Sequence, residues 1–342
     1  MKLNFRRGAA FASQKARDYL KDKNPQDVKN VTVIRHAAIG DFMNIRPFLI
    51  ELREFFPNAK ITLNVLRSSM YGMPNDLIDD AFVMDKIDVV TGKSATLFER
   101  IRQARSMRAQ DVVFDLTDSS LTLLFVIFSN SELKVGYSYR AFRRFFYDVS
   151  TLRSDFLVEA ESVLQQLNVL GCKTRMPLRY GFEAKYAKNV KPRIAYFAGA
   201  SVKNKCWEES KFIALIGKMS KQYSGYDHIV LQGIRDDEKF LNIKEALKEE
   251  DNVLLQEAMP LDEVMQFLSD SALLVSNDTG VRNMAIATQT PTIGLFFDIP
   301  PFRYWPREEK HDCVYNLDYV SPDVDAVYEA SVNMLDKLYK ES

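Results

Sequence analysis

The stretch Val275-Ser276-Asn277-Asp278-Thr279-Gly280-Val281-Arg282-Asn283 stands between two apolar runs, residues 272–275 and 291–297. This order predicts a buried strand, a tight turn, a helix of small residues over 284–288 and a second strand. The first backbone N–H groups of such a helix lack partners in the chain, and the helix dipole favours an anion there. Gly280 lets a ligand approach the backbone closely. By itself the stretch fits either a nucleotide-diphosphate pocket or an ordinary turn whose N-cap is Asp278 or Thr279.

The same alternation of apolar runs and helical periodicity extends through the chain. It predicts strands over 31–34, 61–66, 81–84, 111–116, 134–137, 193–197, 227–231 and 253–255. Strands that alternate with helices favour parallel, doubly wound sheets, so the predicted class is α/β with two Rossmann-like domains. The expected parts are a basic extension (1–29), an N-terminal domain (30–178), a polar linker (179–192), a C-terminal domain (193–322) and a closing helix (323–342).

Two local patterns in the N-terminal domain carry further expectations. Residues 121–128 form an apolar run that fits a buried helix or a buried strand equally. Pro47 precedes a helical apolar pattern, and we expect it in the first turn of that helix, where a missing N–H costs little.

Composition narrows the class of function. The 342 residues are 46% hydrophobic and 27% charged with zero net charge, so a globular protein is expected and no overall charge favours nucleic acid. Cys172, Cys206 and Cys313 lack disulfide or zinc spacing, which is typical of a reduced, cytosolic protein. No run reaches the roughly 18 apolar residues that span a bilayer. The dinucleotide, P-loop and nucleophile-elbow motifs are absent, which disfavours nicotinamide redox, P-loop NTPase and α/β-hydrolase chemistry.

Two segments combine basic and aromatic residues. Residues 1–29 hold eight Lys or Arg and three Asp, a net charge of 8 − 3 = +5, and fit either an amphipathic membrane-surface helix or a frayed tail. Residues 137–153 interleave arginines with aromatics. They fit a loop with snorkelling arginines, a surface for an anionic glycolipid or, less well, a single-stranded nucleic-acid site. The candidate acceptor-binding residues are Arg140, Arg143 and Arg144.

Three motifs occur in the order of a known family. They are Arg35-x4-Gly40-Asp41, then Gly199-Ala200-Ser201 with Lys205-x-Trp207, then Asn277-Asp278-Thr279-Gly280 with the PTIGLF run at 291–296. Over residues 31–310 this resembles glycosyltransferase family 9, the ADP-heptose:lipopolysaccharide heptosyltransferases. The resemblance implies a GT-B fold, two Rossmann-like domains facing a cleft. It also implies inverting transfer of heptose from ADP-heptose to the lipopolysaccharide core, with no metal or other cofactor, at the cytoplasmic face of the inner membrane.

The resemblance also implies roles for residues. Asp41, expected on a glycine-flanked loop, matches the general base, and Lys205 matches the cation that stabilises the leaving diphosphate. The alternatives for these two residues are a helix N-cap and a surface lysine. Ser201, Thr279 and Gly280 match phosphate-binding positions. Asp278, an anion, is expected to cap the helix or to accept ribose or sugar hydroxyl groups.

Two positions depart from the family pattern, both on the donor side. Asn283 stands where the family often has histidine, and it cannot carry a proton charge at neutral pH. A donor-binding glutamate is expected near Arg235-Asp236-Asp237-Glu238, where Asp236 is a possible substitute. Two alternatives therefore stay open: a hexosyltransferase that uses another nucleotide sugar, and a catalytically weak, membrane-associated binding protein.

Overall fold

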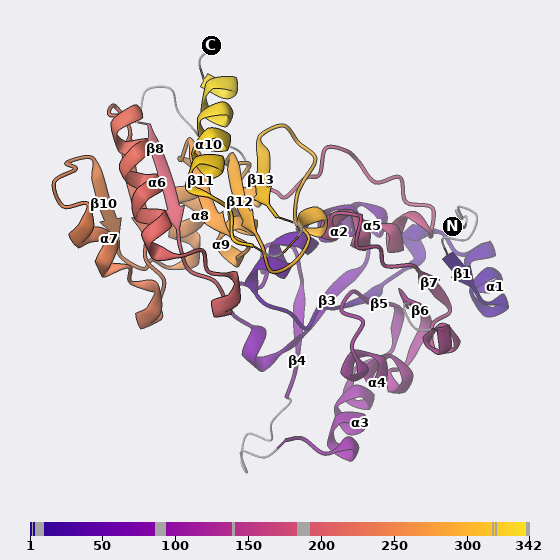
Figure 1. Cartoon of the computed structure of the whole chain (residues 1–342). Helices are drawn as coiled ribbons and strands as arrows, with labels where there is room; N and C mark the ends of the chain where they lie inside the picture. The colour runs from indigo at the N-terminus through magenta and orange to yellow at the C-terminus, as the bar shows by residue number, and fades with distance from the viewer. Residues whose placement is uncertain are drawn as a thin grey trace. The chain divides into compact units, whose positions relative to one another are not determined.

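A computed structural model describes residues 1, 3, 10–85, 94–138, 141–182, 192–316, 318 and 320–339, without the side chains of Ala10, Ala141 and Asp237. The chain divides into two compact units, Met1–Gly181 and Phe182–Ser342, which appear in indigo to magenta and in red to yellow in Figure 1. This division falls inside the segment predicted as the linker (179–192), of which residues 183–191 lie outside the described part.

Unit 1 contains a seven-stranded sheet in the order β1-β7-β6-β5-β2-β3-β4. All pairs are parallel except β1 with β7. The strand order reverses between β2 and β5, a switch point beside which α/β proteins bind ligands at the carboxyl ends of strands. The strands are β1 (Ala10–Ala12), β2 (Asn30–Ile34), β3 (Lys60–Leu66), β4 (Asp80–Met84), β5 (Gln110–Asp115), β6 (Ser131–Tyr137) and β7 (Val149–Thr151).

Five α-helices accompany this sheet in the described part of unit 1. The 121–128 run is a helix. Its N-cap is Ser119, whose side chain accepts the Thr122 N–H. The prediction for Pro47 is wrong: α2 begins at Ile39, so Pro47 lies inside the helix. Only four residues separate β2 from α2, and the helix starts before the apolar pattern that suggested its position. The helices are α1 (Gln14–Asp22), α2 (Ile39–Phe55), α3 (Leu97–Ser106), α4 (Ser120–Phe128) and α5 (Glu159–Asn168).

The basic N-terminal segment is built into unit 1 from residue 10 onward. β1 adds to the edge of the sheet beside β7, and Ser13 caps α1 by accepting the Ala16 N–H. Ala16 and Leu20, on α1, are fully buried. A frayed tail is therefore wrong for residues 10–29, and the apolar face of α1 is already covered by protein instead of being available to a membrane.

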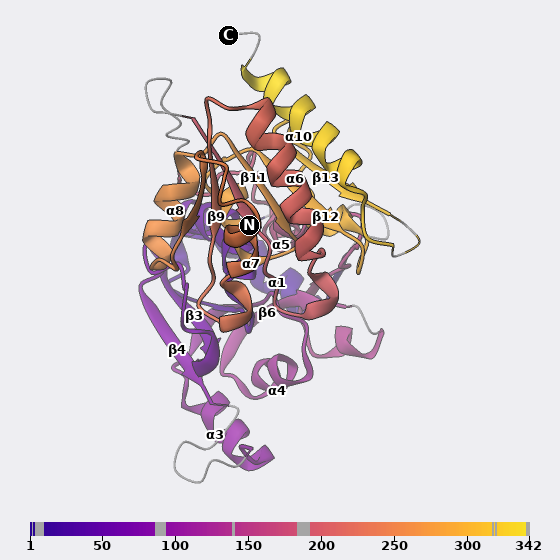
Figure 2. The same cartoon turned by 60° about the vertical axis from the view of Figure 1, so that its left-hand side comes forward.

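Unit 2 contains a six-stranded, fully parallel sheet in the order β10-β9-β8-β11-β12-β13, with its switch point between β8 and β11. Helices α6 and α10 lie side by side over one face (Figures 1 and 2), and α8 packs against α9. The strands are β8 (Arg193–Phe197), β9 (Asp227–Leu231), β10 (Val253–Gln256), β11 (Leu273–Asn277), β12 (Thr292–Phe296) and β13 (His311–Tyr315). The helices are α6 (Glu209–Gln222), α7 (Leu241–Ala246), α8 (Leu261–Ser269), α9 (Gly280–Ala287) and α10 (Val324–Tyr339).

Candidate active site

Asp41 lies in the first turn of α2, just beyond the carboxyl end of β2. The N-cap of α2 is Ala38, and Asp41 is the third residue of the helix. The expectation of a loop position and the alternative of an N-cap role are therefore both wrong. A carboxylate in the first turn is stabilised by the helix dipole. Its side chain keeps 30% of its surface exposed, so it is open to a ligand.

A buried arginine holds this carboxylate. Arg35, only 3% exposed, places Nη2 at 2.8 Å from Asp41 Oδ1 and 3.0 Å from Glu159 Oε1. Arg153 Nη2 lies 2.7 Å from the same Glu159 oxygen, and Glu159 is fully buried. The four side chains thus form a line of alternating charges, Asp41–Arg35–Glu159–Arg153, whose formal charges sum to zero. We call it the charge chain.

The charge chain fixes the position and the charge of Arg35. Its Nη1 also donates to the Leu116 carbonyl at 2.5 Å, at the end of β5. Burial alone lowers the pKa of Arg35, but the charges of Asp41 and Glu159 outweigh burial and raise it. Arg35 therefore stays cationic, and its contacts with β5 and α5 hold Asp41 Oδ1 in one direction.

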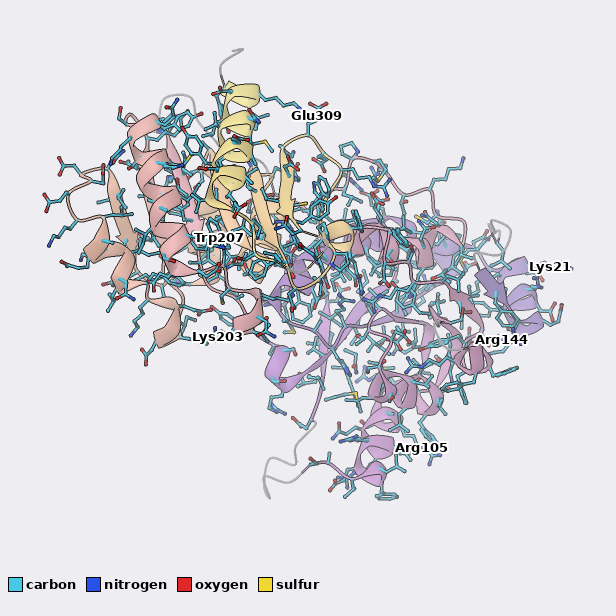
Figure 3. All side chains as sticks on the ribbon, in the orientation of Figure 1. Lys21, Arg105, Arg144, Lys203, Trp207 and Glu309 are labelled. Carbon is cyan, nitrogen blue, oxygen red and sulfur yellow. The ribbon has the colours of Figure 1, made fainter. Side chains whose placement is uncertain are left out.

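The predicted acceptor arginines differ from one another. Arg143 is 5% exposed and forms an ion pair with Asp118, so a carboxylate already engages its guanidinium. Arg144 is exposed (Figure 3). It lies over the ring of Phe145, itself 75% exposed. Arg140 lies outside the described residues. Of the described pair, Arg144 is the one open to a partner.

In unit 2 the turn after β11 opens α9. Thr279 is the N-cap and accepts the Arg282 N–H at 3.4 Å, and Gly280 is the first helical residue. The expectation that Asp278 caps the helix is therefore wrong. Asp278, 10% exposed, instead pairs with Lys205 Nζ at 2.5 Å, and Lys205 is 21% exposed. The structure thus brings together two of the charged residues that the sequence motifs singled out.

Asn277 fixes the loop that carries Lys205. Its buried amide accepts the Trp207 N–H at 3.0 Å and donates to the Ala198 carbonyl at 2.7 Å. Trp207, labelled in Figure 3, has a buried ring whose N–H donates to the Pro322 carbonyl at 2.8 Å. The loops after β8 and β11 are therefore tied together at the switch point. Ser201 is exposed on the first of these loops.

A hollow of about 740 Å³ opens where β8 and β9 end. Glu238 lies against it, and a methyl group built on Gly233 would come within 2.1 Å of its carboxylate. Asp236 is 95% exposed and pairs with Lys239. The carboxylate enclosed by these loops is therefore Glu238, and the suggested substitute, Asp236, points to solvent.

Comparisons with known proteins place this arrangement in a family. The sequence profile of "Glycosyltransferase family 9 (heptosyltransferase)" matches residues 100–331. The chain belongs to glycosyltransferase family 9. It is 19% identical over 298 residues to a lipopolysaccharide heptosyltransferase 1 of Campylobacter coli, covering 80% of this chain and 85% of the relative.

Solved structures of heptosyltransferases share the fold of this family 9 enzyme. The E. coli heptosyltransferase WaaC, solved with ADP, has a TM-score of 0.72 at 15% identity, covering 89% of this chain and 99% of WaaC. The E. coli ADP-heptose lipopolysaccharide heptosyltransferase II has a TM-score of 0.67 at 18% identity, covering 92% and 100%. The predicted GT-B class is thus confirmed.

Asn283, predicted to contact the donor, lies in α9 of this glycosyltransferase. It is 7% exposed on α9, and its backbone N–H donates to the Thr279 carbonyl. Across the described ranges its side chain makes no hydrogen bond. An amide at this position can hydrogen-bond a donor but cannot add a positive charge.

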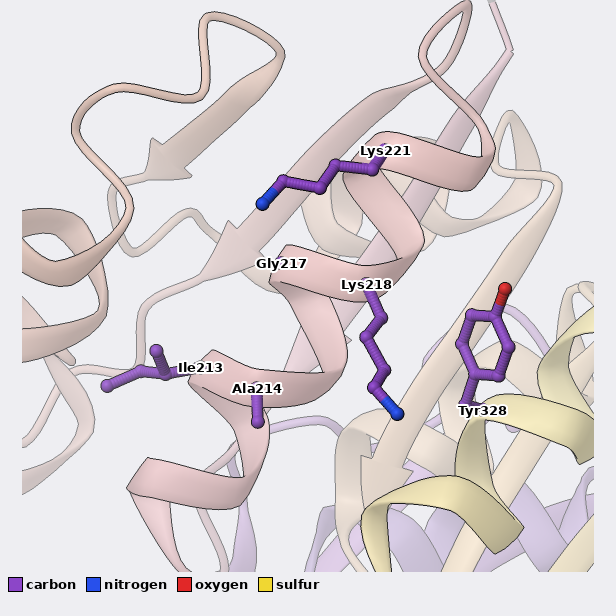
Figure 4. Close-up of a pocket in the computed structure, with 6 residues that line it drawn as sticks. All are labelled: Ile213, Ala214, Gly217, Lys218, Lys221 and Tyr328. Atoms are coloured by element: carbon purple, nitrogen blue, oxygen red, sulfur yellow. The ribbon is translucent and has the colours of Figure 1, made fainter.

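Within the part of the chain that the structure describes, no group of three or more His, Cys, Asp or Glu is arranged to hold a metal ion. None of the helices in those ranges has the length and the apolar character needed to cross a membrane. A shallow groove beside α6 and α10 is lined by Gly217, Lys218, Lys221 and Tyr328 (Figure 4). It holds none of the predicted site residues.

Proposed function

We propose that this glycosyltransferase moves heptose from ADP-heptose to the core of a lipopolysaccharide acceptor, with inversion and without a metal. The observation that carries the proposal is the geometry of Asp41, a carboxylate that is exposed at a strand end and yet held by a buried arginine. The relative from Campylobacter coli and the E. coli structures, which are heptosyltransferases by name, support the choice of sugar.

Asp41 is the general base of the proposed reaction. Arg35 engages Oδ1, which leaves Oδ2 to take a proton. The acceptor oxygen attacks the anomeric carbon of heptose while its proton passes to Asp41, and the bond from that carbon to the diphosphate oxygen breaks. Attack opposite the leaving group inverts the anomeric configuration. A fixed carboxylate contributes by orientation as well as by basicity.

Lys205 stabilises the departing ADP in this proposal. Its Nζ exchanges Asp278 for a diphosphate oxygen, because an ammonium forms strong charge-assisted hydrogen bonds with phosphate. Thr279 and the free N–H groups of the first turn of α9 supply the other donors, and the helix dipole adds to them. Preorganised donors of this kind make a metal unnecessary for charge stabilisation.

The proposed acceptor surface is the 3-10 helix η3 (Ala141–Phe145) with the residue after it. Phe142, Phe145 and Phe146 are 50%, 75% and 39% exposed, and Arg144 lies among them. An apolar, cationic surface suits a phosphorylated glycolipid in an anionic bilayer. We place the reaction at the cytoplasmic face of the inner membrane on this ground.

A transfer assay with a donor panel tests the proposal. Purified protein is given heptose-free core lipopolysaccharide and ADP-heptose, ADP-glucose or UDP-sugars, and product is followed by mass spectrometry and its anomeric configuration by NMR. We expect transfer from ADP-heptose with inversion. If UDP-sugars alone stabilised the protein against heat and served as donors, the assignment of ADP-heptose as the donor would be wrong. Nucleotide binding without transfer from any donor would favour the binding-protein alternative.

A further inference from the structure

Arg282 is a buried cation that the proposed reaction does not use. It is fully buried in the first turn of α9, where a positive charge opposes the helix dipole. Its Nη1 donates to the Tyr304 carbonyl at 2.6 Å, and its guanidinium lies 5.0 Å from the centre of the Phe296 ring. Its Nε and Nη2 have no hydrogen-bond partner among the described residues. Burying a cation with two unpartnered nitrogen atoms is costly, so we ask what the group does in this position.

The sheet beneath Arg282 is shaped to accommodate it. A methyl group built on Gly294, in β12, would lie 2.3 Å from Arg282 Nε. Any side chain at 294 would therefore displace the guanidinium. Burial lowers the pKa of Arg282, and Asp278 is the carboxylate that most strongly opposes this shift. The guanidinium thus lies within electrostatic range of the donor-side pair Lys205–Asp278.

The hydrogen bond to Tyr304 ties down a segment that borders this pair. Residues 297–304 leave the carboxyl end of β12 and include the 3-10 helix η6 (Pro301–Arg303). The first three residues of the segment, 297–299, line a small hollow together with Lys205 and Asp278. Arg282 therefore holds one end of a segment whose other end forms a wall of the donor site.

We propose that Arg282 is a positioning residue for the sugar-diphosphate donor, which acts by holding residues 297–304 against the Lys205–Asp278 pair. The inference rests on the proposed function, in which that pair handles the diphosphate of the donor. Arg282 itself touches no donor atom. Its loss therefore moves the wall and weakens donor binding, while the acceptor and the base in unit 1 are unaffected.

The test measures donor and acceptor KM, kcat and ADP affinity for Arg282→Met, Arg282→Lys and Gly294→Ala. We expect Arg282→Met to raise donor KM and ADP Kd about tenfold with acceptor KM unchanged. Arg282→Lys restores part of the loss, because an ammonium can still donate to the Tyr304 carbonyl. Gly294→Ala reproduces the defect by displacing the guanidinium. In the Arg282→Met background, where no guanidinium is present, Gly294→Ala adds little further loss.

Arg46→Met is the matched control. Arg46 is 2% exposed and also donates to a backbone carbonyl, that of Tyr180, at 2.6 Å, but in unit 1. It is expected to lower the unfolding temperature without changing ADP affinity. If wild type binds ADP and all Arg282 and Gly294 variants bind it equally, the inference fails and the proposed function stands. If wild type binds neither ADP nor ADP-heptose, the proposed function fails.

Discussion

Asp41 and Asp278 are both paired with a cation at the carboxyl end of a strand, but the two pairs are built differently. The partner of Asp41 is Arg35, which is 3% exposed and also engages Glu159 and the Leu116 carbonyl. The partner of Asp278 is Lys205, which is 21% exposed and whose ammonium group makes no other hydrogen bond or ion pair among the described residues. One cation is fixed by several neighbours, and the other is held by a single carboxylate.

This difference matches the two kinds of chemistry that the proposed reaction needs. A general base works best when its carboxylate has one orientation, and a buried arginine cannot leave without exposing unpaired charges. A leaving-group cation has to change partners as the diphosphate arrives. A lysine on a flexible stem, with one partner to release, is suited to that exchange.

The largest expected effect is that of Asp41→Asn. The amide keeps the shape of the carboxylate but cannot take a proton, so kcat for heptose transfer is expected to fall about 10²–10⁴-fold. Unfolding temperature is measured alongside to exclude misfolding. Turnover within a few-fold of wild type would remove Asp41 as the base.

Lys205→Met comes next in size. Removal of the cation is expected to lower kcat/KM for the donor by about 10²–10³-fold, the range typical of lost electrostatic stabilisation. Lys203→Met, two residues earlier on the same loop, is the control and is expected to change kcat/KM little. Equal losses in both variants would indicate a general charge effect of the loop instead of a specific contact.

Glu159→Gln tests whether the charge chain fixes the base. The substitution leaves Arg35 and Arg153 without their shared carboxylate, so the free energy of unfolding is expected to fall by about 3 kcal/mol. Because Glu159 no longer holds Arg35 in place, Arg35 no longer fixes the orientation of the Asp41 carboxylate. At temperatures where the variant is folded, kcat is therefore expected to fall about tenfold, with donor KM unchanged. A fully folded variant with wild-type kcat would show that the chain serves stability alone.

The smallest effects are expected from exchanging the two cation types. Arg35→Lys removes the planar guanidinium group that contacts Leu116, Asp41 and Glu159 together, so kcat is expected to fall several-fold. Lys205→Arg keeps a phosphate-binding cation and is expected to retain most of the donor affinity. Steady-state kinetics of both variants compare the two sites directly. A larger loss of activity in Lys205→Arg than in Arg35→Lys would contradict the division into a fixed and an exchangeable cation.

Much of the fold was predictable from local patterns. Buried parallel strands read as apolar runs, and each predicted strand is present with its ends moved by at most three residues, as at β6. Helix starts were harder, because α2 begins with residues 39–41 before its regular apolar face, which misplaced Pro47. The role of residues 10–29 was missed, since β1 pairs with a strand more than a hundred residues away.

The site was predictable only in part, for a related reason. The motifs located Asp41, Lys205 and the 278–280 turn because each is a short, local signature. The partners of Asp41 in the charge chain include Glu159, which is 124 residues from Arg35 in sequence. Glu159 reads as an ordinary helical residue, and no local signal marks it as buried. Long-range charge pairing of this kind appears only once the sheet places α2 beside α5.

Titration with ADP tests most directly whether Lys205 binds the donor diphosphate while Asp41 serves only as the base. Calorimetry on wild type, Asp41→Asn and Lys205→Met measures the donor-side interaction without any chemistry. The account predicts that Asp41→Asn binds ADP as wild type does, although it has lost transfer, and that Lys205→Met binds ADP at least tenfold more weakly. Wild-type ADP affinity in Lys205→Met, or a comparable loss in Asp41→Asn, would contradict it.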